Sequence, residues 1–288
     1  MARVYLDHAA TTPVDPEVAE AMARVLRDTH GNPSSIYAEG RAARSAVDRA
    51  RDEVAAAINA DPSEIVFTSG GTEADNLALR GVLKVQDGRD GLITTAIEHH
   101  AVIDTARDLE LHAHVRVDVV GVDRYGVVHP EAIRDAIDDR TSLVSVMHAN
   151  NEIGTIEPIA KIGAVCREEG VTFHSDAVQT VGALELDVRE IPVDLLSINA
   201  HKFYGPKGVG ALYVRKGTRI ATMQTGGGQE KGRRTGTENV AGVVALGVAM
   251  RIATPSPTTP ATFSVPVRRP FSWPPPVCIV AIRVPRRT

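Results

Sequence analysis

Residues 65–85 read IVFTSGGTEADNLALRGVLKV, and this stretch sets the fold class. A short β-rich run, Ile65–Thr68, leads through a glycine turn into a helical pattern over Glu73–Val85. A strand joined to a helix in this way is the repeating unit of α/β folds with parallel sheets. We therefore expect the chain around this stretch to repeat the alternation.

The alternation extends over the chain to about residue 253. Strands are predicted at Ile65–Thr68, Leu92–Ala96, Val115–Val120, Leu143–Met147, Val171–His174, Leu195–Ile198 and Ala211–Val214. Helices are predicted at Pro16–Arg27, Gly40–Asn59, Glu73–Val85, His100–Leu109, Pro130–Ile137, Ile159–Glu169 and Glu238–Ile252. We expect one α/β domain over residues 1–253, built on a mostly parallel sheet.

The composition of the chain excludes several classes of function. The 288 residues are 43% apolar and 24% charged, as in soluble globular proteins, and the net charge of −4 offers no general basic field for nucleic acid. Two cysteines exclude a disulfide framework and a four-thiolate metal site. The longest apolar run, Val240–Met250, is shorter than the ~20 residues that span a bilayer, and the first residues, MARVYLDHAATTPVDP, lack the apolar stretch of a signal peptide. We expect a cytoplasmic protein with no membrane or nucleic-acid partner.

Residues 254–288 differ sharply from the rest. They hold nine of the 17 prolines and five arginines, with no glycine and no acidic residue. Such proline content excludes a long helix or a central strand. This tail is either a basic arm for an acidic surface or a proline-recognising domain, or a disordered or foreign extension with no role. The abrupt change of composition favours the second interpretation.

The glycine turn inside the opening stretch suits an anion. Ser69-Gly70-Gly71-Thr72 follows a strand and opens a helix, so backbone N–H groups and the helix N-terminus meet there. The same residues also cap helices where no ligand is present. No G-x-G-x-x-G motif follows a strand, and Gly-Lys does not occur, which excludes a P-loop.

Lys202, one of only six lysines, lies four residues past the end of the predicted strand at Ile198. Open α/β folds bind ligands at the carboxyl ends of their strands, and partial burial there makes an amine nucleophilic. Asp176 also follows a strand, where it suits the pyridinium nitrogen of pyridoxal phosphate or caps a turn. His99 would stack on a cofactor ring or move a proton, and with His100 it makes a poor metal site.

Long motifs identify a family at this point. The sequence resembles the pyridoxal-phosphate-dependent cysteine desulfurases of the NifS/IscS type, within the class V aminotransferase-like family. The resemblance rests on YLDHAATTPVDPEV (5–18), GNPSSIYAEGR (31–41), FTSGGTEADNLAL (67–79), IEHHAV (97–102), MHANNEIGTI (147–156), FHSDAVQTVG (173–182), NAHKFYGPKGVGALYVR (199–215) and GGGQEKGRRTGTEN (226–239). It implies the large domain of the fold type I transferases, a seven-stranded sheet flanked by helices.

The resemblance also implies roles for individual residues. Lys202 would bind the cofactor as a Schiff base, Asp176 would pair with its ring nitrogen, and His99 would stack on the ring and help in proton transfer. Gln179 would bond the phenolic oxygen of the cofactor, and Asn151 would lie beside the cofactor. Gly71, Thr72 and His201 would hold its phosphate. Thr237 would reach across a homodimer to the phosphate of the partner's cofactor. Asn199 stands where the family usually has serine, and its amide would replace a hydroxyl at the phosphate.

The implied reaction converts L-cysteine to L-alanine and passes sulfur, as a persulfide, towards iron–sulfur cluster assembly on an acceptor scaffold protein. Nothing in 254–288 resembles the family's catalytic-cysteine loop or its substrate-binding arginine, and neither Cys166 nor Cys278 has a suitable context. We therefore expect impaired activity. The alternatives are another class V enzyme, such as an aminotransferase or selenocysteine lyase, and a non-catalytic cofactor-binding remnant. Without a following domain, helix 238–252 should expose apolar surface.

Overall fold

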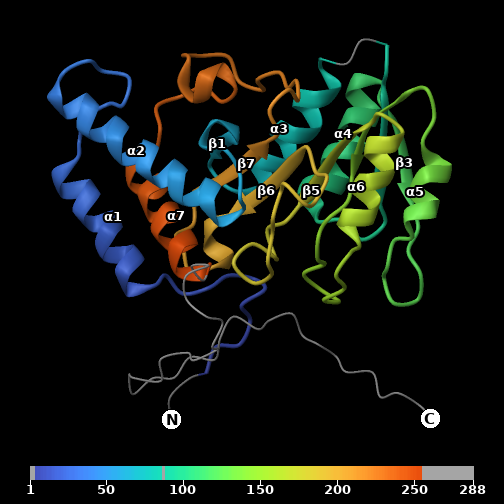
Figure 1. The fold of residues 1–288 in the computed structure, drawn as a ribbon, viewed down its shortest axis with the longest axis horizontal. Helices are drawn as coiled ribbons and strands as arrows, with labels where there is room; N and C mark the ends of the chain where they lie inside the picture. Colours follow the sequence, from blue (N-terminus) through green and yellow to red (C-terminus); the bar gives the residue numbers. More distant parts are fainter. Residues whose placement is uncertain (1–3, 86–87, 255–288) are drawn as a thin grey trace.

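The fold is an α/β sandwich built on one seven-stranded sheet (Figure 1). The computed structural model describes residues 4–85 and 88–254. The strands lie in the order β1 (Ile65–Thr68), β7 (Gly210–Val214), β6 (Leu195–Asn199), β5 (Thr172–Asp176), β4 (Thr141–Ser145), β2 (Gly91–Thr95) and β3 (Arg116–Val120). All seven predicted strands are confirmed, with ends shifted by one or two residues.

One strand runs against the others. β7 pairs antiparallel with both β6 and β1, while the remaining pairs of neighbours are parallel. The connection from β6 to β7 holds only the short 3₁₀ turn η2 (Ala200–Lys202), too little for the crossover that a parallel strand requires. The predicted mostly parallel sheet is therefore confirmed. The segment that carries Lys202 forms the link between the two opposed strands.

Seven α-helices accompany the strands, as predicted. They are α1 (Pro16–Asp28), α2 (Ala38–Ala57), α3 (Gly71–Leu83), α4 (His100–Ala113), α5 (Pro130–Ala136), α6 (Ile159–Glu168) and α7 (Val240–Ala253). Local sequence explains several starts. Asp15 accepts a hydrogen bond from the Glu17 N–H before Pro16, and Asn239 accepts one from the Gly242 N–H.

The two sheet faces have separate cores because side chains alternate along each strand. Ile93 and Val144 pack with α1, α2, α5, α6 and α7 on one face. Their neighbours Leu92 and Leu143 pack with α3 and α4 on the other face. Figure 1 shows α3 and α4 on the far side of the sheet from α2 and α7.

The expected exposure of α7 is wrong for most of that helix. α7 packs against α1 and α2, and Leu246, Ala249 and Met250 are fully buried. Gly247 allows this close approach, because a Cβ there would lie 2.9 Å from the Cα of Ala50 on α2. Among its large apolar side chains only Ile252 is exposed, at 37%. The apolar composition of α7 thus reflects packing inside this domain.

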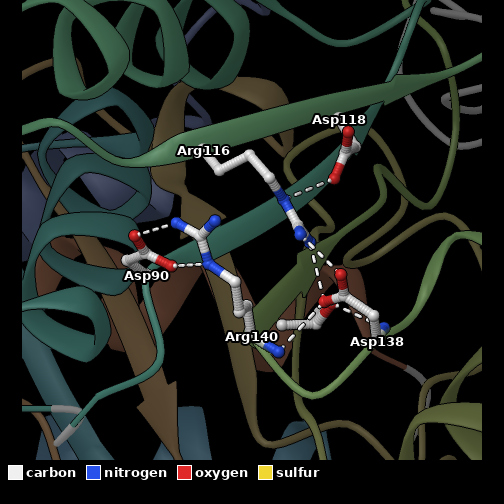
Figure 2. Close-up of polar contacts among 6 residues, drawn as sticks. Asp90, Arg116, Asp118, Asp138 and Arg140 are labelled. Atoms are coloured by element: carbon white, nitrogen blue, oxygen red, sulfur yellow. Dashed lines mark hydrogen bonds and ion pairs between the residues drawn. The ribbon is translucent and has the colours of Figure 1, made fainter.

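An ion-pair network joins the amino ends of β2, β3 and β4 (Figure 2). Arg116 makes a bidentate pair with Asp138, at 2.5 and 2.8 Å, and its Nε lies 3.0 Å from Asp118. Arg140 makes a second bidentate pair with Asp90. The network lies at the end of the sheet opposite the strand carboxyl ends, so it fixes the edge strand β3 without entering the site described below.

Within the described ranges, no helix combines the length and apolar character needed to cross a membrane. The predicted proline-rich tail, residues 254–288 with Cys278, lies outside the described residues apart from Thr254, which ends α7.

Candidate active site

The predicted site residues gather at the carboxyl ends of the central strands. Asp176 is the last residue of β5, and Asn199 is the last residue of β6. Lys202 follows Asn199 on η2, and Gly71 opens α3 after β1. His99 is the N-cap of α4 and accepts a hydrogen bond at Nδ1 from the Ala101 N–H, at 3.1 Å. A crevice at this end of the sheet is the usual ligand position in open α/β folds.

Lys202 reaches across to the N-terminal segment. Its Nζ donates hydrogen bonds to the carbonyl oxygens of Ala9 and, at 3.0 Å, Ala10. Burial lowers the pKa of Lys202, while the negative charges of Asp176 and Asp7 oppose that shift. A half-buried amine with a lowered pKa holds its lone pair available at neutral pH more often than an exposed lysine does, and this favours attack on a carbonyl group.

Asp176 is a buried carboxyl in this site. It is 6% exposed, and burial raises its pKa. The Val178 N–H, which donates to its Oδ1 at 2.9 Å, and the positive charges of His99 and Lys202 lower that pKa. These interactions place the carboxyl within electrostatic reach of both predicted catalytic side chains.

The start of α3 forms a tight cradle. A Cβ on Gly71 would lie 2.8 Å from Val178 Cγ2 and 3.3 Å from Asn199 Nδ2, so only glycine fits. Asn199 Oδ1 is buried and has no hydrogen-bond partner, whereas Thr72 is exposed at the rim. The helix N-terminus favours an anionic ligand group, and the unpartnered Asn199 oxygen is an acceptor that calls for a hydrogen-bond donor.

His201 and Gln179 border the site from two sides. His201 Nδ1 lies 3.0 Å from Thr11 Oγ1, and burial, together with the charges of Lys202 and Lys207, lowers the pKa of His201 to about 4. His201 is therefore neutral at pH 7. Gln179 Nε2 donates to the Ala9 carbonyl at 3.0 Å, the same oxygen that Lys202 contacts.

Two predicted residues lie apart from this group. The Asn151 side chain donates to Glu152 at 2.9 Å, and Thr237 is exposed beside Ser69 and Gly208 on a pocket of about 90 Å³. In the part of the chain that the structure describes, neither has a hydrogen bond to Lys202 or Asp176. Residues 4–85 and 88–254 contain no group of three His, Cys, Asp or Glu side chains arranged to hold a metal.

Comparison with known proteins identifies the family. Residues 4–256 match the aminotransferase class-V family. This chain belongs to the aminotransferase class-V family. Relatives named "Cysteine desulfurase IscS" include one from Clostridium botulinum strain Hall, 50% identical over 87% of this chain and 63% of its own length. Another, from Dictyoglomus turgidum, is 51% identical over 87% of this chain and 64% of its own length. The chain thus spans less than two thirds of these relatives.

Solved structures at 40% identity or more share the fold. A structure titled "NifS-like protein" superposes with a TM-score of 0.85 at 43% identity, covering 88% of this chain and 70% of that one. A second, titled "SspA in complex with cysteine", superposes with a TM-score of 0.83 at 40% identity, covering 86% of this chain and 72% of that one. The predicted fold class and family are confirmed.

Class-V enzymes depend on pyridoxal phosphate, and the residues of this chain fit that cofactor. The glycine cradle at the N-terminus of α3 suits the phosphate, and the Asn199 amide would have to donate to it through Nδ2, because the unpartnered Oδ1 is an acceptor. Asp176, at the end of β5, suits the ring nitrogen, and Lys202 suits the carbonyl carbon. The departure from serine at residue 199 therefore leaves a polar side chain in place.

Sequence reasoning missed three contributors to this class-V site. The carbonyl groups of Ala9 and Ala10 hold Lys202, although the motif around them gives no side-chain signal. Glu98, next to His99, accepts from Thr95 Oγ1 at 2.8 Å and from the Met147 N–H at 2.9 Å. An acidic residue three positions after the end of β2 and next to His99 is the signal that would have found Glu98.

Proposed function

We propose that residues 1–253 form the cofactor-binding domain of a cysteine desulfurase. The reaction would convert L-cysteine and an acceptor thiol to L-alanine and a persulfide, so the C–S bond breaks and the sulfur passes to the thiol. The observation that carries the proposal is the placement of Lys202, with its lowered pKa, within electrostatic reach of buried Asp176. The 50% identity to named cysteine desulfurases supports this choice within the class-V family.

Pyridoxal phosphate, when bound, supplies an electron sink for bonds at the substrate α-carbon and β-carbon. We propose that Lys202 holds the cofactor and moves the proton at the substrate α-carbon. Asp176 would keep the ring nitrogen protonated, and His99 would lie on the ring face. Gln179, Asn199, His201, Gly71, Thr72 and Asn151 would complete the binding set.

The described residues do not supply a thiol that could accept the sulfur. Cys166 is buried in α6, and burial raises its pKa to about 12, so it is a protonated structural thiol. We propose that a thiol outside the described residues accepts the sulfur, which could then pass to a scaffold protein for iron–sulfur cluster assembly. A reducing cytoplasm is the compartment that we propose for this chemistry.

We also propose a homodimer in which Thr237 of each copy reaches the cofactor phosphate of the other. Its exposed position on the loop before α7 supports this arrangement. Sedimentation velocity of the full chain tests the dimer. T237A should keep the dimer and weaken cofactor binding, and a monomer at micromolar concentration would contradict the proposal.

The cofactor itself gives the direct test of function. Purified chain is mixed with pyridoxal phosphate, and the visible absorbance band is compared with that of K202A before and after L-cysteine is added. Alanine and sulfide are measured with and without dithiothreitol as a surrogate acceptor thiol. Lys202-dependent alanine formation that requires dithiothreitol supports the proposal. A Lys202-dependent band with no alanine under either condition contradicts the desulfurase reaction, and the absence of such a band contradicts cofactor binding.

A further inference from the structure

A second carboxyl lies buried behind the proposed cofactor site. Asp75 is 1% exposed and sits one helical turn after Gly71, so both residues lie on the same side of α3. That side packs against β5 and β6, the strands that end in Asp176 and Asn199. The helix that forms the proposed phosphate cradle therefore also carries an acidic group into the interior.

Asp75 belongs to a hydrogen-bonded group drawn from three strands. His174 lies between two hydroxyl groups, with Nδ1 2.8 Å from Ser145 Oγ and Nε2 3.0 Å from Ser197 Oγ. His174 Nε2 is also 3.5 Å from Asp75 Oδ1, and Ser197 hydrogen-bonds to the Asp75 carboxyl. Strand register explains the assembly, because Ser145 pairs with His174 and Ser197 pairs with Asp176.

The charges around the two carboxyl groups differ. Burial is the largest cause that raises the pKa of Asp75, and the charge of Asp176 raises it further, whereas a hydrogen bond from Ser197 lowers it. Glu98, whose own pKa burial raises to about 8, is the smallest of these influences. The one basic neighbour of Asp75 is His174, whose pKa burial lowers to about 3, so His174 gives no positive charge. Asp176, in contrast, has Lys202 and His99 nearby and accepts the Val178 N–H. Two buried carboxyls with such unequal surroundings share one proton unequally.

We propose that Asp75 holds the proton of this buried pair and thereby keeps Asp176 as the ionised partner for the cofactor ring nitrogen. Asp75 acts through Asp176 and is a positioning residue. His174 bridges Ser145 and Ser197, so its imidazole donates at one nitrogen and accepts at the other, whereas Asp75 Oδ1 is buried without a hydrogen-bond partner. The role in cofactor binding rests on the proposed function, whereas the position of the proton is a property of the protein alone.

Unfolding of the protein without cofactor tests the position of the proton. A carboxyl whose pKa is raised by folding binds more protons in the folded state above about pH 4, so stability falls as pH rises. Urea unfolding of wild type and D75N is measured from pH 5 to 8. The ratio of their unfolding constants, wild type over D75N, should rise by up to about tenfold per pH unit. A ratio of unfolding constants that stays the same from pH 5 to 8 would overturn the proposal.

Control variants keep this result specific. D52N removes an exposed carboxylate on α2 and should leave a constant ratio to wild type. In a D176N background, the ratio of unfolding constants with and without D75N should stop rising at a lower pH, because the repulsion from Asp176 is absent. The same slope in both backgrounds would overturn the shared proton. Asp75→Ser, which retains a hydroxyl, replaces D75N in the series if the asparagine variant does not fold.

Cofactor titration by absorbance separates this inference from the proposed function. D75N should bind pyridoxal phosphate as wild type does at pH 7.5, because asparagine preserves a neutral group, whereas D176N should bind at least about tenfold more weakly. Equal losses in D75N and D176N would overturn the assignment of the proton. If no variant shows Lys202-dependent binding, the proposed function fails, and the unfolding series still decides where the proton resides.

Discussion

Gln179 and Lys202 donate hydrogen bonds to one carbonyl oxygen, that of Ala9. The N-terminal segment thereby closes one side of the proposed active site through the Ala9 carbonyl, and its Thr11 side chain contacts His201. Thr12 anchors the segment, because its N–H and Oγ1 both donate to the His201 carbonyl, at 2.9 and 3.0 Å, and its Oγ1 accepts from the Tyr204 N–H at 2.7 Å. The position of the lysine thus depends on residues almost two hundred positions earlier.

Loss of this anchor should loosen both the segment and Lys202. T12V removes a buried hydroxyl and with it the hydrogen bonds to the His201 carbonyl and from the Tyr204 N–H, so we expect a loss of ~1–3 kcal/mol in unfolding free energy. Cofactor affinity should fall as well. T12S keeps the hydroxyl and should retain most of the unfolding free energy and most of the cofactor affinity. Urea unfolding and absorbance titration measure the two effects, and equal values for T12V and T12S would contradict the anchoring role.

The glycine cradle should tolerate no methyl group. G71A places a Cβ 2.8 Å from Val178 Cγ2 and 3.3 Å from Asn199 Nδ2, so the start of α3 must shift. We expect at least about a tenfold loss of pyridoxal phosphate affinity, equivalent to ~1.4 kcal/mol. G121A is the matched control, since a Cβ at Gly121 meets nothing within 4 Å. Unchanged cofactor affinity in G71A would rule out the cradle as the phosphate site.

A buried ion pair fixes the loop that carries Thr237. Arg51 and Glu230 pair at 2.7 and 2.8 Å, and Glu230 also accepts the buried Phe67 N–H at 3.0 Å. E230A would leave Arg51 without its partner, with an expected loss of ~3–5 kcal/mol in unfolding free energy.

The exposed pair between Arg27 and Glu20 provides the control for this comparison. E20A should have little effect, because solvent screens that pair. Urea unfolding compares the two variants. Similar losses for E230A and E20A would show that burial does not set the strength of the Arg51–Glu230 pair.

Glu98 should make stability depend on pH. Burial raises the pKa of Glu98 to about 8, against about 4.3 for an exposed glutamate. The folded protein therefore binds the extra proton, and the stabilising contribution falls as pH rises from about 4.3 through 8. As pH rises from 5 to 9, the stability of E98Q relative to wild type should increase, as measured by thermal unfolding. A constant difference across that range would show that Glu98 is already ionised at pH 5.

Cys166 should be inert in the folded protein. In a C278S background, a thiol reagent at pH 8 should label no cysteine until urea is added, because Cys166 is buried and its pKa is raised to about 12. Rapid labelling of the folded chain would show that α6 opens readily or that Cys166 is an available sulfur acceptor.

The sequence by itself determined the seven strands, the seven helices and most of the proposed cofactor contacts. Hydrophobic periodicity and glycine turns are local signals, and the positions of Asp176 and Lys202 after apolar strands follow from them directly. Long motifs identified the family for the same reason, since each one is contiguous in the chain.

Only the tertiary structure decided the antiparallel direction of β7, the burial of α7, the contact of Lys202 with Ala9, and the grouping of Asp75 with His174 and Ser197. Each depends on elements far apart in sequence. Local patterns carry no information about strand order or register, and it is register that places Ser145 beside His174 and Ser197 beside Asp176. The chemistry proposed for the site therefore begins with local motifs, whereas the protonation of its carboxyl groups is set by packing between strands and helix α3.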